Sequence, residues 1–315
     1  MKGRIEYLDA LKCFAIILVV LGHVLQNVLY RESFAEMHIF RYIYAFHMPL
    51  FMMISGYVGK NSYPCLTLNS IKKWSHRLLV PFVSFTFIIA IQYWSIEYVY
   101  KALLYPDNSL WFLWVLFWIK VIYSSFEDVK YRLNIPIWIL VLLMFLMLSV
   151  LSFVIGNIFS ISLIGRYLVF YAIGVYIGRD RINEKSSLTF GVLLLAAFFV
   201  LGYFYKFQKT IFPINVQIID KLTYMLEAYC IAMIACYAIM ILFSRLKTIP
   251  WIMKKIGKET LGIYGIHVVL INMIPSSVFS MGGLINTVII TLGLIAMSLL
   301  LIYLYDSLKL YLKLS

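Results

Sequence analysis

Charged residues are scarce in this chain of 315 residues, and acidic ones are the scarcest. Asp and Glu number 14 against 27 Lys and Arg, whereas 63% of the residues are apolar and the mean hydropathy is +0.92. A soluble domain of this length does not need so much apolar surface, so the composition excludes a soluble globular protein and indicates a polytopic membrane protein. The net charge of +13 does not point to nucleic acid, because the basic residues lie between apolar spans as topology signals do.

Cysteine is also rare, and several catalytic motifs are absent. The cysteines show neither paired nor metal-ligand spacing, so we expect no disulfide and no metal; they are Cys13, Cys65, Cys230 and Cys236. The sequence contains no Gly-x-Ser-x-Gly elbow, no His-Glu-x-x-His motif and no P-loop. These absences exclude the common serine hydrolases, zinc peptidases and ATP-driven machines.

No stretch rich in Gly, Ser or Pro divides the chain. We therefore expect a single membrane domain over residues 1–315, without an appended soluble domain. The first apolar run continues beyond a short signal-peptide core and meets no small-residue cleavage site, so we interpret it as a retained helix.

The chain contains about ten apolar spans, each of the length that a tilted membrane helix needs. The predicted fold is thus an all-α integral membrane protein, a single bundle of about ten transmembrane helices. The spans are 11–30, 39–58, 78–96, 109–125, 136–155, 160–178, 188–204, 221–243, 260–275 and 284–304.

Lysine and arginine are distributed unevenly between the loops. If the N-terminus lies in the cytoplasm, roughly three quarters of them, Lys120 included, fall on the cytoplasmic side. The residues that fall outside are Arg31, Lys101, Lys206, Lys209 and Lys221, and Arg41 and Arg166 lie within spans near their outer ends. The bias predicts that both termini are cytoplasmic.

The first span carries a polar stripe. At roughly 100° per residue, its polar side chains fall within an arc of about 100°; they are Asp9, Lys12, His23, Gln26 and Asn27. His23 lies about 16 Å beyond Lys12 on the same face, near the bilayer midplane if Lys12 marks the water boundary. An ionisable residue at that depth indicates a functional site.

Two further histidines, His47 and His267, lie within spans at depths that allow all three to meet near the middle of the membrane. Each of these two is equally well explained as a satisfied structural histidine or as a group that orients His23 or the acceptor. Burial favours a neutral imidazole, so His23 is suited to act as a general base on a hydroxyl or as a transient acyl carrier.

Two other charged features allow more than one interpretation. Glu227 lies in the outer half of its span, where a buried ion pair with Arg41 or Arg166 explains it without chemistry. A basic cluster lies just before the third span, in a predicted cytoplasmic loop from Lys60 to Arg77; its members are Lys72, Lys73, His76 and Arg77. It is either a positive-inside anchor or a phosphate clamp.

Several segments together resemble the acyltransferase 3 family of bacterial membrane acyltransferases, and the likeness covers nearly the whole chain. They are Arg4–Lys12, Leu21–His23, Phe46–Phe51, Ile54–Tyr57, Arg77–Pro81, Leu110–Leu113 and Ile256–His267. The family signature on the first helix is an arginine, ten residues, and then a histidine. His23 matches the histidine, whereas Lys12 occupies the arginine position and lacks its bidentate fork.

The resemblance implies a bacterial inner-membrane enzyme that moves an acyl group, usually acetyl from acetyl-CoA, to a hydroxyl of a cell-surface or lipid-linked sugar. His23 would be the base or acyl relay, with Lys12, His47 and His267 as further catalytic candidates. The donor's phosphates would be held by Lys12, Lys72, Lys73 and Arg77. The expected partners are a glycan acceptor and membrane lipids.

Two other functions fit the same residues. A proton-coupled transporter would use His23, His47, Glu227 and His267 as a proton relay. A membrane scaffold for a polysaccharide assembly complex would need none of them for chemistry.

Overall fold

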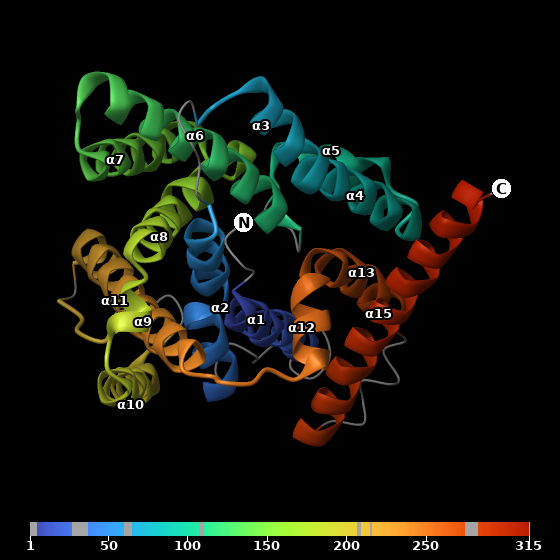
Figure 1. The fold of residues 1–315 in the computed structure, drawn as a ribbon. Helices are drawn as coiled ribbons and strands as arrows, with labels where there is room; N and C mark the ends of the chain where they lie inside the picture. The colour runs from blue at the N-terminus through green and yellow to red at the C-terminus, as the bar shows by residue number, and fades with distance from the viewer. Residues whose placement is uncertain are drawn as a thin grey trace. The chain divides into compact units, whose positions relative to one another are not determined.

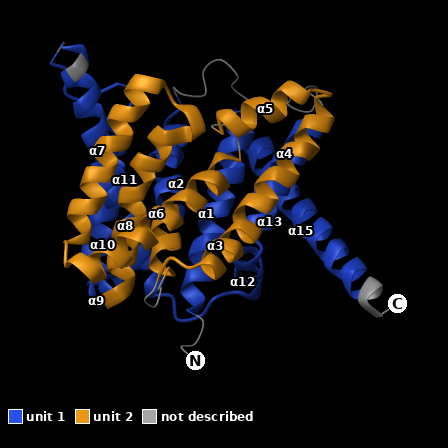
Figure 2. Cartoon of the chain, turned by 90° about the horizontal axis from the view of Figure 1, so that it is seen from above, with its two compact units in different colours: residues 1–51, 181–315 blue, residues 52–180 orange. Residues whose placement is uncertain are grey.

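The computed structural model describes residues 5–26, 37–59, 65–106, 110–206, 209–214, 216–274 and 283–314. These residues are helical apart from their connections and one isolated bridge between Lys206 and Lys209 (Figure 1). The prediction of an all-α protein is confirmed. The chain divides into two compact units, residues 1–51 with 181–315 (unit 1) and residues 52–180 (unit 2), as Figure 2 shows.

Helix α2 (His38–Tyr57) crosses the boundary between the units, and every other helix belongs to one of them. The remaining helices of unit 1 are α1 (Glu6–Val24), α9 (Ile182–Lys185), α10 (Leu188–Phe204), α11 (Gln217–Ser244), α12 (Trp251–Lys258), α13 (Thr260–Met273) and α15 (Leu284–Leu314). Those of unit 2 are α3 (Leu68–Trp74), η3 (Ser75–Leu79), α4 (Val80–Gln92), α5 (Ile96–Leu104), α6 (Trp111–Leu133), α7 (Ile137–Ile155), η4 (Ile158–Ser160) and α8 (Ile161–Asp180).

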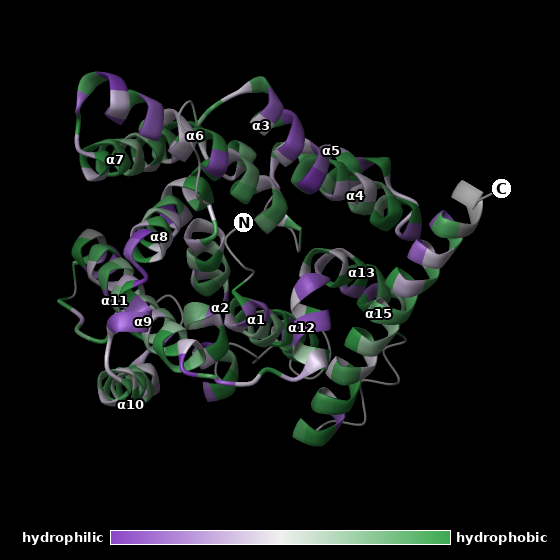
Figure 3. Cartoon of the chain, in the orientation of Figure 1, coloured by the Kyte–Doolittle hydropathy of each residue, from purple (hydrophilic) through white to green (hydrophobic). Residues whose placement is uncertain are grey.

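Helices cover most of the described part of each predicted apolar span. Within the described residues, 6 helical segments are long and apolar enough to cross a membrane, and two shorter apolar helices, α10 and α13, add to them (Figure 3). The six are Glu6–Val24, Leu68–Gln92, Ile137–Ile155, Ile158–Asp180, Ile219–Ser244 and Leu284–Leu310.

The third helix begins earlier than the sequence indicated. Leu68–Gln92 is one continuous helical segment, so the prediction of a loop around Lys72, Lys73 and Arg77 was wrong. Pro81 has no amide hydrogen and cannot form the regular bond to the carbonyl of Arg77. A π-helical turn, Ser75–Leu79, precedes it and lets the helix continue without a break.

Helix α1 forms the centre of unit 1. It packs against α11, α12, α13 and α15 and is buried along most of its length, because apolar side chains cover its surface outside the polar stripe. The contact with α12 requires glycine at position 257. A Cβ there would lie 1.9 Å from the carbonyl oxygen of Asp9, so only a residue without a side chain lets the two backbones approach this closely.

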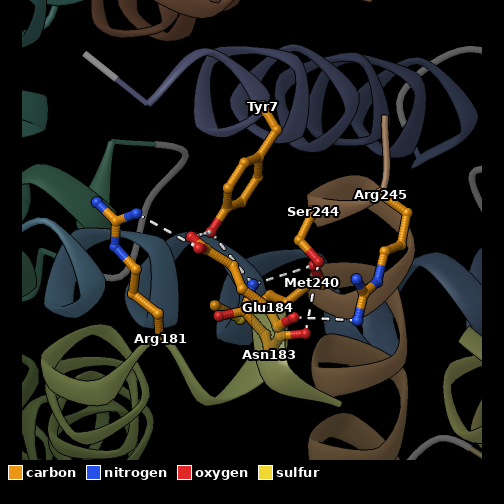
Figure 4. Close-up of polar contacts among 7 residues, drawn as sticks. All are labelled: Tyr7, Arg181, Asn183, Glu184, Met240, Ser244 and Arg245. Carbon is orange, nitrogen blue, oxygen red and sulfur yellow. Dashed lines mark hydrogen bonds and ion pairs between the residues drawn. The ribbon is translucent and has the colours of Figure 1, made fainter. Parts of the chain in front are cut away.

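A polar network ties the start of α1 to α9 and to the end of α11 (Figure 4). The Tyr7 hydroxyl donates to Glu184 Oε1 at 3.0 Å and accepts from Asn183 Nδ2 at 3.2 Å. Arg181 forms an ion pair with Glu184 at 3.4 Å, and Arg245 donates to the backbone carbonyls of Glu184 and Ser186. These contacts fix one end of the helix that carries His23.

In unit 2, α7 and α8 pack along each other and α6 packs on both. The outer side of α7 consists of exposed apolar side chains, as expected for a helix that faces lipid; they include Leu142, Leu143, Leu146, Met147 and Val150. Asp128, near the end of α6, accepts hydrogen bonds from the amides of Cys65 and Leu66 at 2.7 and 2.9 Å. Burial raises the pKa of the Cys65 thiol, so this cysteine is protonated at neutral pH.

Candidate active site

Two of the three predicted histidines meet directly in unit 1. His23, in the last turn of α1, places its Nδ1 2.9 Å from Nε2 of His267 on α13. The two rings are stacked, with 5.1 Å between centroids and 20° between planes. His267 is completely buried and His23 is partly buried. The pair therefore joins two helices that lie at opposite ends of the sequence.

The hydrogen bonds assign the tautomers of this pair. His267 Nδ1 lies 2.9 Å from the carbonyl oxygen of Ile263, which can only accept, so His267 Nδ1 carries a hydrogen. In a neutral His267, Nε2 is then an acceptor, and His23 Nδ1 donates to it. A neutral His23 consequently has its lone pair on Nε2, in the orientation that a general base requires.

His47 on α2 is buried and lies close enough to His23 for the two imidazoles to interact electrostatically. Its Nδ1 donates to the carbonyl of Ile43 at 2.7 Å, so its lone pair is also on Nε2. The ring of Tyr44 packs edge-on against His47, with 4.7 Å between centroids, and the Tyr44 hydroxyl donates to Gln26 at 3.0 Å. All three predicted intramembrane histidines thus lie in one region of unit 1.

Glycine at position 22 allows Tyr44 to take this place. A Cβ on Gly22 would lie 2.9 Å from Cε2 of Tyr44, closer than real Cβ contacts allow. The residue directly before His23 therefore makes room for the tyrosine that contacts His47.

Lys12 lies on the same helix as His23, about 16 Å away along its axis. Its Nζ is 3.9 Å from Oδ1 of Asp9, which is buried, while Lys12 itself is partly exposed. The polar stripe predicted for this helix is thus built from an ion pair at one end and a histidine pair at the other. Asn27, the last member of the predicted stripe, lies outside the described residues.

The basic cluster belongs to unit 2. Lys72 and Lys73 are exposed near the end of α3, and Arg77 is exposed in the π-helical turn. In the part of the chain that the structure describes, none of the three forms an ion pair with a carboxylate. A surface with several cations and no counter-charge is suited to bind phosphate groups.

Lys120 on α6 belongs to the same cluster. It is close enough to Arg77 and Lys73 for their like charges to repel. Its Nζ lies 5.5 Å from the ring centroid of Tyr171 and 6.0 Å from that of Trp74, at cation–π distance. Among the described residues no carboxylate forms an ion pair with Lys120 either.

Comparison with known proteins identifies the family. A family model described as an acyltransferase domain, acyltransferase 3, matches residues 5–306. The chain belongs to the acyltransferase 3 family. The resemblance drawn from the sequence is therefore confirmed, and family membership together with the apolar helices makes the chain a multi-pass membrane protein.

Two curated members of similar sequence are nodulation proteins. Nodulation protein NolL of Sinorhizobium fredii is 54% identical over 56 residues, which are 17% of this chain and 15% of that protein. Nodulation protein NolL of Mesorhizobium japonicum is 30% identical over 127 residues, or 35% of this chain and 32% of that protein. The matches thus span a third or less of these relatives' length. No solved structure matches the chain.

The sequence did not identify two features of this acyltransferase 3 chain. Lys120 was counted only as a cytoplasmic charge, although its position among the apolar and aromatic residues of Val115–Lys120 is an unusual one for a topology signal. The second feature is the environment of Glu227, for which the prediction of an ion pair was wrong. Its carboxylate accepts instead from the Thr210 hydroxyl at 2.8 Å and from the amides of Ile211 and Phe212 at 2.8 and 3.3 Å.

Proposed function

We propose that this chain is a membrane O-acyltransferase that moves an acyl group from cytoplasmic acyl-CoA to a hydroxyl of a cell-surface or lipid-linked sugar. The acyl group that we expect is acetyl. The observation that carries the proposal is the His23–His267 pair in a member of the acyltransferase 3 family. An intramembrane imidazole with a defined tautomer is the group that hydroxyl activation requires. The sugar acceptor rests on what the family does in general.

His23 acts as the general base in this mechanism. Its Nε2 takes the proton of the acceptor hydroxyl as the oxygen attacks the carbonyl carbon of the thioester. The carbon–sulfur bond then breaks, and the imidazolium returns the proton to the departing sulfur, which leaves as the CoA thiol. The hydrogen bond from Nδ1 to His267 holds the ring in one tautomer throughout and stabilises the imidazolium.

His267 acts as a positioning residue, because it reaches the reaction through His23. It is completely buried and fixed by its bond to the Ile263 carbonyl. His47 lies on α2 in the same region, and we assign it to orienting the acceptor.

The cluster of Lys72, Lys73, Arg77 and Lys120 holds the phosphates of the donor. No ion pair of these cations with a carboxylate is present among the described residues, which favours a polyanion such as the phosphates of CoA. Arginine binds phosphate through two parallel hydrogen bonds. Lys12 is a further candidate for this role. It keeps the charge of the family's arginine but not the bidentate geometry.

The proposed architecture is a single domain of about ten transmembrane helices, in a bacterial inner membrane, with both termini in the cytoplasm. The excess of lysine and arginine on one side of the apolar spans supports this orientation. In it, the donor cluster near the start of the third helix faces the cytoplasm, where acyl-CoA is made.

The test is CoA release by purified protein. Protein in detergent is incubated with acetyl-CoA, with and without added cell-envelope glycans, and free thiol is followed for the wild type and for His23→Ala. We expect release by the wild type and a loss of about 10²–10⁴-fold in the variant, the range of general base catalysis. CoA binding and thermal unfolding of both proteins establish that the variant is folded and loaded. Equal release by the two proteins would overturn the role of His23. No release and no CoA binding by the wild type would favour the proton-coupled transporter.

A further inference from the structure

Arg41, in the first turn of α2, is a buried cation whose charge is not balanced by its described neighbours. Only 7% of the residue is exposed. Its Nη1 donates to the carbonyl of Tyr205 and its Nη2 to Nδ1 of His38, both at 2.9 Å. Its Nε is buried and has no hydrogen-bond partner in the described structure. No carboxylate of the described ranges lies within ion-pair distance of it. A buried charge in such a position requires a counter-ion.

The acidic side chains of the neighbouring segment, residues 209–227, have other partners. Glu227, the carboxylate that the sequence suggested for Arg41, accepts three hydrogen bonds from residues Thr210, Ile211 and Phe212. Asp220 accepts from the amide of Ile214 at 2.7 Å. Both carboxylates therefore fix the connection between α10 and α11 instead of neutralising Arg41.

His38 adds a second donor beside Arg41. A guanidinium can only donate, so His38 Nδ1 is the acceptor of their bond, and a neutral His38 carries its hydrogen on Nε2. His38 is exposed and its ring is stacked on Tyr203, with 5.2 Å between centroids and 9° between planes. Lys206 follows Tyr205 directly and is also exposed. The surroundings of Arg41 thus combine positive charge, hydrogen-bond donors and a flat aromatic surface.

We propose that Arg41 and His38 bind the anionic group, a phosphate or a carboxylate, of the glycan acceptor on the outer side of the membrane. Arginine recognises both groups through parallel charge-assisted hydrogen bonds, and the stacked Tyr203 ring offers a flat surface for an adjoining sugar ring. The assignment deepens the proposed function, because it presumes a glycan acceptor and the orientation in which the start of α2 faces outward. The two sources of the anion are the phosphate of a lipid-linked sugar and the carboxylate of an acidic sugar.

The experiment measures binding to the full-length protein in detergent by thermal shift, with glucose 1-phosphate, glucuronate and neutral glucose as probes. For the wild type we expect one of the two anionic sugars to raise the unfolding temperature by several degrees at concentrations at which glucose does not. Arg41→Gln should lose the shift. The matched control Lys221→Gln, which removes an exposed charge from α11, should keep it.

His38→Ala provides a second variant in case Arg41→Gln does not fold, because His38 is exposed and its loss leaves no buried gap. A shift with glucose 1-phosphate alone identifies a phosphate, and a shift with glucuronate alone identifies a carboxylate. No shift with either sugar, or equal shifts in the wild type and both variants, would overturn the proposal. Thermal shift does not depend on acyl transfer, so its outcome is separate from that of the CoA-release test.

Discussion

The histidine pair connects the local chemistry to the fold at the scale of single residues. His267 serves His23 as a hydrogen-bond acceptor, so a side chain that can still accept should preserve part of the function. We predict that His267→Gln lowers kcat for acetyl transfer by about 10-fold and His267→Leu by about 100-fold or more, the loss expected for a buried hydrogen bond to a group that becomes charged. The KM for acetyl-CoA should stay nearly the same in both.

Steady-state kinetics of the two variants separate this role from a purely structural one. If His267 only filled space, leucine would be tolerated at least as well as glutamine. Equal activities, or higher activity of the leucine variant, would contradict the pairing. Thermal unfolding measured in parallel shows whether either variant has lost its fold.

The cationic cluster makes a different prediction. Lys120→Met should raise the KM for acetyl-CoA by about 10–100-fold, with a smaller change in kcat, because charge-assisted hydrogen bonds to phosphate contribute binding energy to the donor. Lys185→Met, which removes an exposed lysine from α9, is the matched control. Equal KM values for the two variants would show that Lys120 does not bind the donor.

Sequence periodicity located His23 because its place in an apolar helix is costly and therefore informative. Its bond to His267 could not be predicted, since the partners are 244 residues apart and no local pattern links them. Glu227 illustrates the opposite error. Its charge suggested an arginine partner, whereas backbone amides of a nearby connection donate hydrogen bonds to its carboxylate. Every residue type except proline has such an amide, so the pattern of side chains could not predict these bonds.

At the scale of helices, α12 approaches the backbone of α1 closely at Gly257. We predict that Gly257→Ala destabilises the protein by about 1–3 kcal/mol, because its methyl group would overlap the Asp9 carbonyl and force the helices apart. Gly293→Ala on α15 is the control, since a Cβ there meets nothing within 4 Å and alanine favours a helix. Thermal unfolding in detergent compares the two. A drop of equal size in both variants would refute the close-packing explanation.

The apolar spans predicted the helices well because length and hydrophobicity determine them directly. The ends of the helices were predicted less well. The polar first turns of a helix, such as Leu68–Trp74 with its Thr67 cap, have the low hydropathy of a loop. The π-helical turn that connects Leu68–Trp74 to α4 compensates for Pro81, and hydropathy does not reveal such a turn. The short amphipathic helices α5 and α12 were missed for the same reason.

At the scale of the whole molecule, the distribution of basic residues predicts which ends of the membrane helices face the outside of the cell. In intact cells, a membrane-impermeant maleimide should label Lys206→Cys, on the connection between α10 and α11, but not Lys185→Cys, between α8 and α10. Permeabilised cells should show labelling of both. The parent chain with its native cysteines provides the background. Labelling of Lys185→Cys alone in intact cells would show that the topology is the reverse of the proposed one.

Composition alone indicated the class of the molecule, since 63% apolar residues suit only a membrane environment. The order and spacing of weak motifs along the chain indicated the family, which the match over residues 5–306 confirms. The acceptor was not predictable. The proposed acceptor site uses Arg41 and His38, which the residues around them single out and their spacing in the sequence does not.

The most direct test of the central claim is the transfer of label from acetyl-CoA, radioactive in its acetyl group, to cell-envelope glycans in membranes that contain wild-type protein or His23→Ala. We predict alkali-labile label on the glycan with the wild type and a loss of at least 100-fold with the variant, in membranes that contain equal amounts of folded protein. Equal labelling by the two proteins would contradict the role of His23 as the catalytic base.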